Sequence, residues 1–337
     1  METRRDFILK MTGATAGLML PVSLLKGCSS ESDSLGYVLP KRKLGKTGEK
    51  VTMLGTGGYH VGWTSEKDAR EVIEASIEGG IRFFDTAHNY GKGESETRYG
   101  KYLIPNYRDH IFLMTKSQAL DGESLLKEFE LSLSRLKTDH VDLLQLHSFR
   151  SPEDVDSRIE KGVMKAIHSI KSSGKARYIG FTGHQNPYAH LRMMEQFDDY
   201  PEFSTLQMPL NVVDYNSEHS FVRKTLPLAI ENELGILAMK TLADGRFFDR
   251  KLQVDNLKWE TDKPVVPDHV SMKEALYFSW SLPISVLITG AENKEMLLEK
   301  IKLAKDFVKI SEEERTAILE NASRAPHAEE VEYYKRV

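Results

Sequence analysis

Ile81-Arg82-Phe83-Phe84-Asp85-Thr86-Ala87-His88-Asn89-Tyr90 is a short apolar run that ends in a carboxylate and leads into a loop carrying a phenol. Two later apolar runs end in the same manner. Residues 111–115 precede Lys116, and residues 141–146 precede His147. Barrel enzymes keep their chemistry at the C-terminal ends of successive parallel strands. The spacing therefore predicts that Asp85, Tyr90, Lys116 and His147 meet at one end of a barrel.

Strand-like and helix-like segments alternate along the chain and predict an (α/β)8 TIM barrel of eight β/α units. The expected strands are 52–57, 82–86, 111–116, 141–147, 176–182, 204–210, 235–240 and 285–289. The expected helices lie near 65–79, 94–103, 122–136, 158–173, 188–197, 220–232, 270–281 and 293–307. A doubly wound open sheet is the competing architecture. Gly55-Thr56-Gly57-Gly58 lacks the third glycine of its usual nucleotide-binding turn, which favours the barrel.

Three further segments flank or interrupt these units. Tyr37–Val51 contains Gly45-Lys46-Thr47-Gly48 between short β-like runs and predicts an N-terminal hairpin. Phe247–Asp268 is the longest irregular stretch, which either shapes a substrate pocket or is a surface excursion. Ser311–Glu314 opens a C-terminal helical extension, whose tail is expected to pack over the barrel's edge.

Composition bounds the classes of function. The chain has 337 residues, 40% of them hydrophobic and 28% charged, with a net charge of −4, so we expect no nucleic-acid partner. The single cysteine, Cys28, excludes disulfides and cysteine-ligated zinc or iron–sulfur clusters within one chain. His60, His88 and His184 lie near expected strand ends, but their spacing matches no familiar ligand pattern, so we predict no metal site.

The first 28 residues differ in character from the rest and predict an export signal. Arg4-Arg5 before Phe7 resembles a twin-arginine signal, which would make the twin-arginine export machinery a partner. Residues 25–28 resemble a lipobox, although Lys26 fits poorly, and this suggests a lipid anchor at Cys28. A disordered basic N-terminus is the alternative. Residues 29–36 are expected to be a flexible tether to a barrel domain over 37–337, which would be periplasmic or anchored to a membrane by its lipid.

The four strand-end groups suit proton transfer to a carbonyl oxygen. A free tyrosine has a pKa near 10 and is a reluctant acid at neutral pH. Lys116 could lower the pKa of Tyr90 by stabilising the phenolate, while Asp85 holds the ammonium in place. His147 could donate a hydrogen bond to the substrate carbonyl and orient it. A lone histidine, lysine or aspartate at a strand end is often structural, so the combination carries the hypothesis.

These residues resemble the aldo/keto reductase superfamily. The resemblance rests on residues 84–91, Thr115-Lys116 and Leu143–His147, and extends from about Lys43 to Phe307. It implies a barrel, a dinucleotide cofactor (NADP or NAD) and reversible reduction of a carbonyl, with Asp85, Tyr90, Lys116 and His147 as catalytic tetrad. The substrate would be a small carbonyl compound or a polyol.

The resemblance also implies that the cofactor lies across the strand ends. The expected contacts are Gly57, Gly58, Asp85, Thr182, Gln207, Met239, Lys240, Thr289, Gly290 and Ala291. Gly183 stands where many members have an asparagine, and Met239-Lys240 where many stack a tyrosine on the nicotinamide. NADP-preferring members commonly have cations at the positions of Gly290 and Met296. Lys294 or Lys300 could compensate, so the choice between NAD and NADP stays open.

Other functions remain compatible with the sequence. The protein could be a membrane-anchored cofactor-binding sensor or accessory subunit with little turnover, or a lyase or sugar epimerase that uses its cofactor transiently. Tyr59, Trp63 and Trp259 near the expected mouth would suit a sugar, although they could equally be packing residues. The intact set of four strand-end groups favours an oxidoreductase.

Overall fold

The computed structural model describes residues 31–253, 256–326, 328–335 and 337, and Glu31–Val337 forms one compact unit. The export signal expected over residues 1–28, including Arg4, Arg5 and Cys28, lies outside the described residues. No helix in the part of the chain that the structure describes has the length and apolar character needed to cross a membrane.

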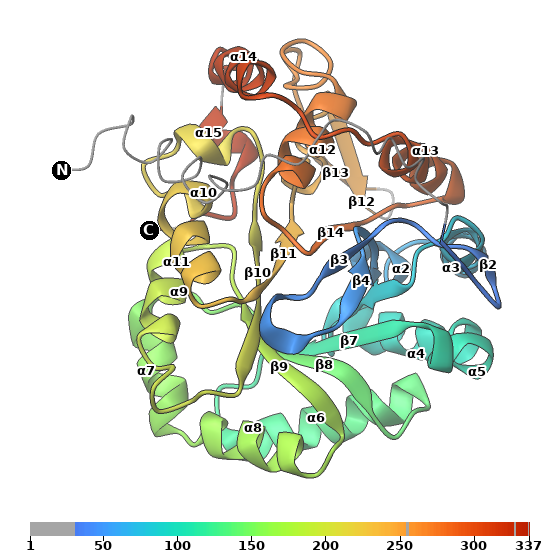
Figure 1. Ribbon diagram of the computed structural model, residues 1–337, viewed down its shortest axis with the longest axis vertical. Coiled ribbons are helices and arrows are strands. Elements are labelled where there is room, and N and C mark those ends of the chain that lie inside the picture. Colours follow the sequence, from blue (N-terminus) through green and yellow to red (C-terminus); the bar gives the residue numbers. More distant parts are fainter. Residues whose placement is uncertain (1–30, 254–255, 327, 336) are drawn as a thin grey trace, which may run out of the picture. The chain divides into compact units, whose positions relative to one another are not determined.

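Eight parallel strands close into a barrel, as predicted (Figure 1). In chain order they are β5 (Leu54–Gly57), β6 (Phe83–Asp85), β7 (Phe112–Ser117), β8 (Val141–Leu146), β9 (Ala176–Thr182), β10 (Phe203–Pro209), β11 (Gly235–Met239) and β14 (Val286–Thr289). Each strand pairs with its sequence neighbour among these eight, and β14 pairs with β5 to complete the ring. Nearly every strand residue is buried, because helices cover the outside and side chains fill the inside.

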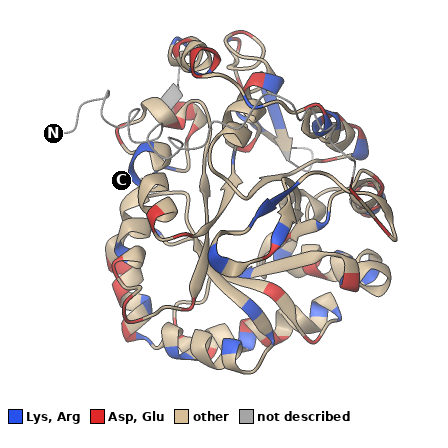
Figure 2. Cartoon of the chain, in the orientation of Figure 1, with Lys and Arg blue, Asp and Glu red and all other residues tan. Residues whose placement is uncertain are grey.

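Helices surround this ring, and most of them lie where the periodicity predicts. They are α2 (Gly58–Val61), α3 (Glu66–Glu78), α4 (Glu94–Tyr102), α5 (Ile104–Tyr107), α6 (Gly122–Leu136), α7 (Pro152–Glu160), α8 (Val163–Ser172), α9 (Pro187–Met194), α10 (Phe221–Lys224), α11 (Leu226–Glu231), α12 (Met272–Ser281), α13 (Lys294–Lys305), α14 (Glu312–Ser323) and α15 (Ala328–Val331). The Ser65 side chain accepts a hydrogen bond from the Asp68 backbone and starts α3, as the sequence suggests. Figure 2 shows charged residues concentrated on these helices and largely missing from the barrel strands.

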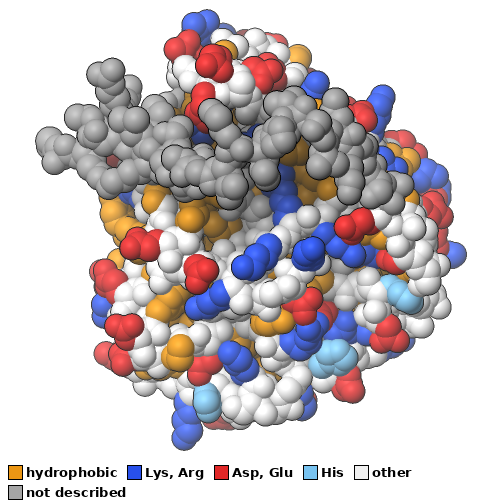
Figure 3. All heavy atoms as spheres, viewed as in Figure 1, with side chains coloured by type: hydrophobic (Ala, Val, Ile, Leu, Met, Phe, Trp, Pro, Cys, Tyr) orange, Lys and Arg blue, Asp and Glu red, His pale blue; other side chains and the backbone are white. Residues whose placement is uncertain are grey.

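The N-terminal end of the barrel is closed by the predicted hairpin, β3 (Lys41–Lys43) and β4 (Lys50–Thr52). Its Leu44 joins an interior cluster with Phe83 and Phe112, whose rings stack at 5.2 Å between centroids. Gly45 has φ +51, and a Cβ there would lie 2.2 Å from the Gly235 nitrogen, so the hairpin tip fits closely against the start of β11. Basic side chains, with acidic ones among them, mark this face in Figure 3.

Two expected helices are each divided in two. The helix expected at 158–173 is α7 followed by α8, because Gly162 at φ +81 turns the chain between them. The helix expected at 220–232 is α10 followed by α11, because Pro227 in the first turn of α11 has no N–H to continue the preceding helix.

Two segments expected to be irregular have structure. Phe247–Asp268 contains an antiparallel hairpin of β12 (Arg250–Gln253) and β13 (Asn256–Glu260). In the stretch expected to be a tether, β1 (Ser32–Asp33) pairs with β2 (Gly36–Tyr37). The Asp33 carboxylate accepts two hydrogen bonds from the nearly buried Arg82 guanidinium. The sequence pattern could not show this ion pair, because its partners are far apart in the chain.

Candidate active site

Asp85 and Lys116 form a buried ion pair at the C-terminal ends of neighbouring strands. The parallel register of β6 and β7 brings the two strand ends together, and both residues are at most 2% exposed. The Lys116 ammonium also donates to the Thr86 carbonyl oxygen at 2.8 Å. Burial raises the pKa of Asp85 and lowers the pKa of Lys116, and each charge opposes the shift of the other. The strand geometry therefore holds a fixed cation at this point.

Tyr90 and His147 lie against this pair, as the sequence predicts. Lys116 Nζ is 3.4 Å from the Tyr90 hydroxyl and 4.7 Å from the centre of its ring. The His147 ring meets Tyr90 edge to face, with 5.7 Å between centroids. The structure thus brings all four predicted groups into one cluster.

The pKa of Tyr90 moves in the direction opposite to the one expected. Burial raises it well above 10, and the Asp85 carboxylate raises it further. Asp85 offsets the charge of Lys116, so the ammonium does not dominate the field at the phenol. In this arrangement Tyr90 is held as a protonated hydrogen-bond donor.

A buried arginine that sequence reasoning missed holds the backbone beneath His147. Arg158 on α7 donates to the carbonyl oxygens of His147 (3.1 Å) and Ser148 (3.3 Å). Ser148 has φ +63, a conformation that needs such support in a residue with a side chain. Asp154 pairs with the guanidinium at 3.0 Å. On the sequence, Arg158 was one more polar residue at a helix start, so no signal marked it.

The His147 imidazole is neutral and available. Burial, followed by the charge of Lys116, lowers its pKa well below 6.5. Its Nδ1 has no hydrogen-bond partner among the described residues. A neutral imidazole has one N–H to donate, so His147 can bind a carbonyl oxygen beside Tyr90.

The strand ends next to the four groups fit a bound amide. Gln207 on β10 is 1% exposed, and its Oε1 lacks a partner within the described part of the chain. Thr182 is equally buried at the end of β9. Gly183 has no room for a side chain, since a Cβ there would lie 2.6 Å from the Phe149 oxygen and 2.7 Å from His190 Nε2. Buried polar groups usually have partners, so Gln207 is suited to hold a carboxamide.

Several predicted cofactor glycines also have packing reasons. A Cβ on Gly58 would lie 2.5 Å from the Asp85 carbonyl oxygen, and one on Gly57 would lie 3.1 Å from the Thr289 oxygen. Glycine at both positions lets β5, β6 and β14 approach one another closely. Thr289 and Ala291 are buried beside them. These positions are therefore explained by close packing of the strand ends, whether or not they also contact a cofactor.

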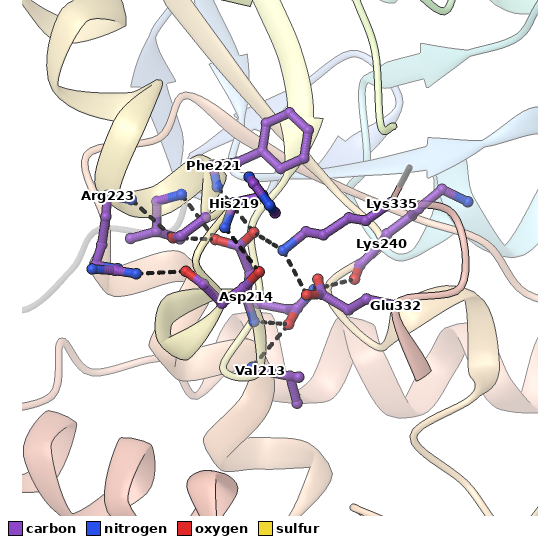
Figure 4. Close-up of polar contacts among 12 residues, drawn as sticks. Val213, Asp214, His219, Phe221, Arg223, Lys240, Glu332 and Lys335 are labelled. Carbon is purple, nitrogen blue, oxygen red and sulfur yellow. Dashed lines mark hydrogen bonds and ion pairs between the residues drawn. The ribbon is translucent and has the colours of Figure 1, made fainter. Parts of the chain in front are cut away.

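The C-terminal tail covers the ends of β10 and β11, which agrees with the expected packing over the barrel's edge. Tyr334 is buried, with the Lys240 ammonium 4.9 Å from its ring centre and the His184 ring edge to face. The Asn211 amide donates to the Lys240 carbonyl oxygen and to the Tyr334 hydroxyl. Figure 4 shows Lys335 between Asp214 and Glu332, with Nζ to carboxylate oxygen distances of 2.5 and 2.6 Å. Lys240 therefore already contacts Tyr334 of the tail through its ammonium and Asn211 through its carbonyl oxygen.

A cleft of about 560 Å³ is lined by residues of α2, the start of α3, β12 and the turn before α13. Its lining includes Tyr59, Trp63, Lys251 and Glu292. The cleft lining does not include Asp85, Tyr90, Lys116 or His147, but its Tyr59 ring meets Tyr90 edge to face at 5.4 Å. Trp259 does not contribute, because its Nε1 donates to the Phe248 carbonyl oxygen and its ring packs on Arg246. Among the described residues, no three or more His, Cys, Asp or Glu side chains gather in a way that could hold a metal ion.

Residues 53–320 match the model of the Aldo/keto reductase family. The chain belongs to the aldo/keto reductase family. It is 26% identical to an uncharacterized oxidoreductase of Bacillus subtilis, YqkF, over 82% of this chain and 95% of that protein. It is 30% identical to L-galactose dehydrogenase of Arabidopsis thaliana over 60% of this chain and 66% of that enzyme.

Solved structures support the fold. The holo form of the aldo-keto reductase AKR11C1 from Bacillus halodurans superposes with a TM-score of 0.68 at 23% identity, covering 86% of this chain and 98% of that one. Family membership and these relatives make the protein an oxidoreductase enzyme, of the class that reduces carbonyl compounds. Aldo/keto reductases in general use NAD or NADP.

Proposed function

We propose that the protein reduces an aldehyde, ketone or keto-sugar to an alcohol, or runs the reverse reaction, with a bound nicotinamide dinucleotide. One observation carries the proposal: the Lys116 ammonium lies between the Asp85 carboxylate and the Tyr90 hydroxyl, with His147 facing the same phenol. A hydroxyl donor and an imidazole donor then converge on one point, which suits a carbonyl oxygen.

The residues of this chain would divide the work as follows. Gln207 and Thr182 would hold the carboxamide of the dinucleotide, whose nicotinamide supplies the hydride when bound. His147 donates a hydrogen bond to the substrate oxygen and fixes its orientation. Tyr90 passes its proton to that oxygen. The Lys116 ammonium, 3.4 Å from the Tyr90 hydroxyl, opposes the Asp85 charge and so limits the cost of the phenolate left behind. Asp85 keeps Lys116 charged and in position.

The aromatic residues beside Tyr90 support a polar substrate such as a sugar or polyol. Tyr59 packs against Tyr90, Trp63 packs against Tyr59, and Tyr90 and His147 carry hydrogen-bonding groups beside these rings. Such a mixture binds the apolar faces and the hydroxyl edges of a sugar at once. The relative named L-galactose dehydrogenase is consistent with this choice of substrate.

Export remains part of the proposal, because the Arg4-Arg5 pair and Cys28 have the order that an exported lipoprotein would have. A protein that folds around its dinucleotide before export would carry its cofactor with it. The double variant Arg4→Lys/Arg5→Lys should leave the precursor in the cytoplasm. The variant Cys28→Ser should release a soluble exported form. Cell fractionation measures where each variant accumulates. Normal export of the first variant would refute the twin-arginine assignment.

Hydride transfer is the decisive experiment. The protein would be incubated with deuterated NADH or NADPH and a panel of aldehydes, ketones and keto-sugars. Deuterium on the carbinol carbon of the product, detected by mass spectrometry, is the expected result. Cofactor binding with no transfer to any carbonyl, and none in the reverse direction from polyols, would instead support a sensor or accessory subunit.

A further inference from the structure

The end of β14 and the start of α13 form the corner where a barrel of this kind commonly binds phosphate. Backbone N–H groups at the start of a helix attract anions, and Gly290–Asn293 leads into the 12-residue helix α13. A cofactor with an additional phosphate would need additional positive charge here. The charges of this corner therefore bear on the choice between NAD and NADP.

Lys300, one of the two lysines considered above as compensating cations, faces inward. Lys300 is 6% exposed, and its Nζ donates to the Gly290 carbonyl oxygen at 2.6 Å. Burial lowers the pKa of Lys300 to about 8, so even its charge is weakened near neutral pH. Lys300 therefore stabilises the turn after β14 through its hydrogen bond to Gly290.

No side chain can be added at Gly290 without moving the partly buried ring of His60. A Cβ there would lie 2.1 Å from His60 Nδ1 and 2.5 Å from His60 Cε1. The His60 ring thus fills the space where a cation at position 290 would begin. Burial lowers the pKa of His60 to about 4, which leaves the ring neutral at physiological pH.

Two further cations of this corner, Lys251 and Lys294, each lie near a carboxylate. Lys294 Nζ lies 3.9 Å from Glu71 on α3. Lys251 on β12 binds the Asp244 carboxylate at 2.8 Å. The cleft between them is lined by two more carboxylates, Asp68 and Glu292. Glu292 makes no hydrogen bond or ion pair with another described residue, although it lies near enough to Lys300 to interact with its charge. Its acceptor oxygens are therefore available.

We propose that this corner selects NAD and rejects NADP, with Glu292 as the specificity-determining residue that accepts hydrogen bonds from the adenosine ribose. The proposal rests on the dinucleotide-dependent function above. A carboxylate next to a ribose accepts from its 2′-hydroxyl, which is how other nucleotide-binding folds favour NAD. A 2′-phosphate at the same place would bring roughly 1.5–2 negative charges toward Glu292 and Asp68. Of the nearby cations, Lys251 is already paired with Asp244, and Lys294 shares Glu71 with Lys67.

Binding of the two reduced dinucleotides tests the proposal without any turnover. NADH and NADPH would each be titrated into the purified protein. Quenching of the protein's intrinsic fluorescence is the readout, and calorimetry is a second measure of affinity. We expect NADH to bind at least about tenfold more tightly than NADPH. Raising the ionic strength should narrow the difference, because partly exposed charges are screened by salt.

Charge reversal at Glu292 sharpens the test. Glu292→Lys should tighten NADPH binding by about tenfold or more and weaken NADH binding, which reverses the preference. The control is Glu295→Lys, the same change one residue into the first turn of α13, at an exposed position outside the cleft lining. It should leave the ratio of the two affinities unchanged, and its melting temperature shows whether the helix tolerates the charge.

Each outcome decides the matter. Equal or tighter binding of NADPH by the unmodified protein would overturn the selection of NAD while leaving the dinucleotide-dependent function intact. The same shift in both lysine variants would show that general charge, and not Glu292, sets the preference. A protein that binds neither dinucleotide would overturn this inference and the proposed function together.

Discussion

The two ends of the barrel differ in the way they treat polar groups. At the N-terminal end, the hairpin places Leu44 and Val51 against Phe83 and Phe112, and this interior cluster is apolar throughout. At the C-terminal end, an ion pair is buried beside Tyr90, and polar atoms of His147 and Gln207 lack partners within the described residues. One end contributes stability, and the other carries unsatisfied groups that a ligand could complete.

The same strands build both ends, because side chains alternate along a strand. On β6, Phe83 and Asp85 both face the barrel interior, while Phe84 between them meets Tyr99 of α4 on the outside. On β7, Phe112 belongs to the interior cluster and Lys116 to the site. The polar groups of the site therefore follow the apolar layer by two residues on β6 and by four on β7, within the same strands.

Strained backbone is denser at the C-terminal end, although Lys137 and Glu233, which precede β8 and β11 at the N-terminal end, also have positive φ. Lys240, Ala243 and Asp244 have φ of +51, +47 and +59, all directly after β11 at the C-terminal end. Asp244 joins this loop to the β12–β13 hairpin through Lys251 and to the tail through the Tyr333 hydroxyl. Strain of this kind persists where surrounding contacts determine the conformation, and it concentrates at functional sites.

The largest effect is expected at the reactive end. Tyr90→Phe should reduce carbonyl reduction by roughly 10²–10⁴-fold, since the proton donor is lost. Dinucleotide affinity should change little, because the ring and its packing remain. Steady-state rates and binding titrations measure the two quantities. The control is Tyr107→Phe on α5, outside the site, and near-normal turnover of the Tyr90 variant would contradict the assignment of the acid.

The second effect should appear at the closed end, as lost stability with intact chemistry. Leu44→Ala should lower the free energy of unfolding by about 2–5 kcal/mol, since it leaves a cavity in a fully buried cluster. Urea denaturation measures this loss, and NADH or NADPH titration checks the site. A Leu44 variant with unchanged stability but impaired cofactor binding would reverse the division between the two ends.

A smaller effect depends on pH. His190 on α9 is fully buried between Phe181 and Phe221, and burial lowers its pKa to about 3 from 6.5. Between these values the unfolded chain binds the proton and the folded protein does not, so stability falls as pH decreases below about 6.5. His190→Leu should remove this part of the pH dependence, worth about 2 kcal/mol at pH 5.

The measurement for His190 is urea denaturation at pH 8 and pH 5. The variant should gain stability relative to the unmodified protein as pH falls, with only its packing change visible at pH 8. A difference that is the same at both pH values would show that His190 does not stay neutral in the folded protein.

The smallest effect concerns the tail. Tyr333→Phe removes the hydroxyl that donates to Asp244 at 2.7 Å and leaves the ring on Arg246, so docking of the tail should weaken by about 1 kcal/mol. Hydrogen exchange of the amides at 330–335 should speed up by roughly the matching factor of five. Unchanged exchange would mean that the remaining contacts, led by Lys335 with Asp214, hold the tail without this bond.

The sequence predicted the order of the elements and the clustering of Asp85, Tyr90, Lys116 and His147. Periodicity of apolar residues located the strands to within two residues, since each strand is buried on both faces. It failed where breaks depend on backbone conformation, at Gly162 and Pro227, and where polar residues form a hairpin, as in β12–β13. The expected contacts of Lys240 and Gly290 with the cofactor stay predictions.

The sequence by itself determined the barrel, because alternation of buried strands and amphipathic helices is a local property of the chain. It also determined which groups end the strands, since a strand's last residue is fixed by its own apolar run. Only the tertiary structure decided their surroundings: Arg158 beneath His147, His60 in the space beside Gly290, and Lys300 turned inward. Burial and pairing arise between segments far apart in the chain, and they set the pKa of each group and the charge that a ligand meets.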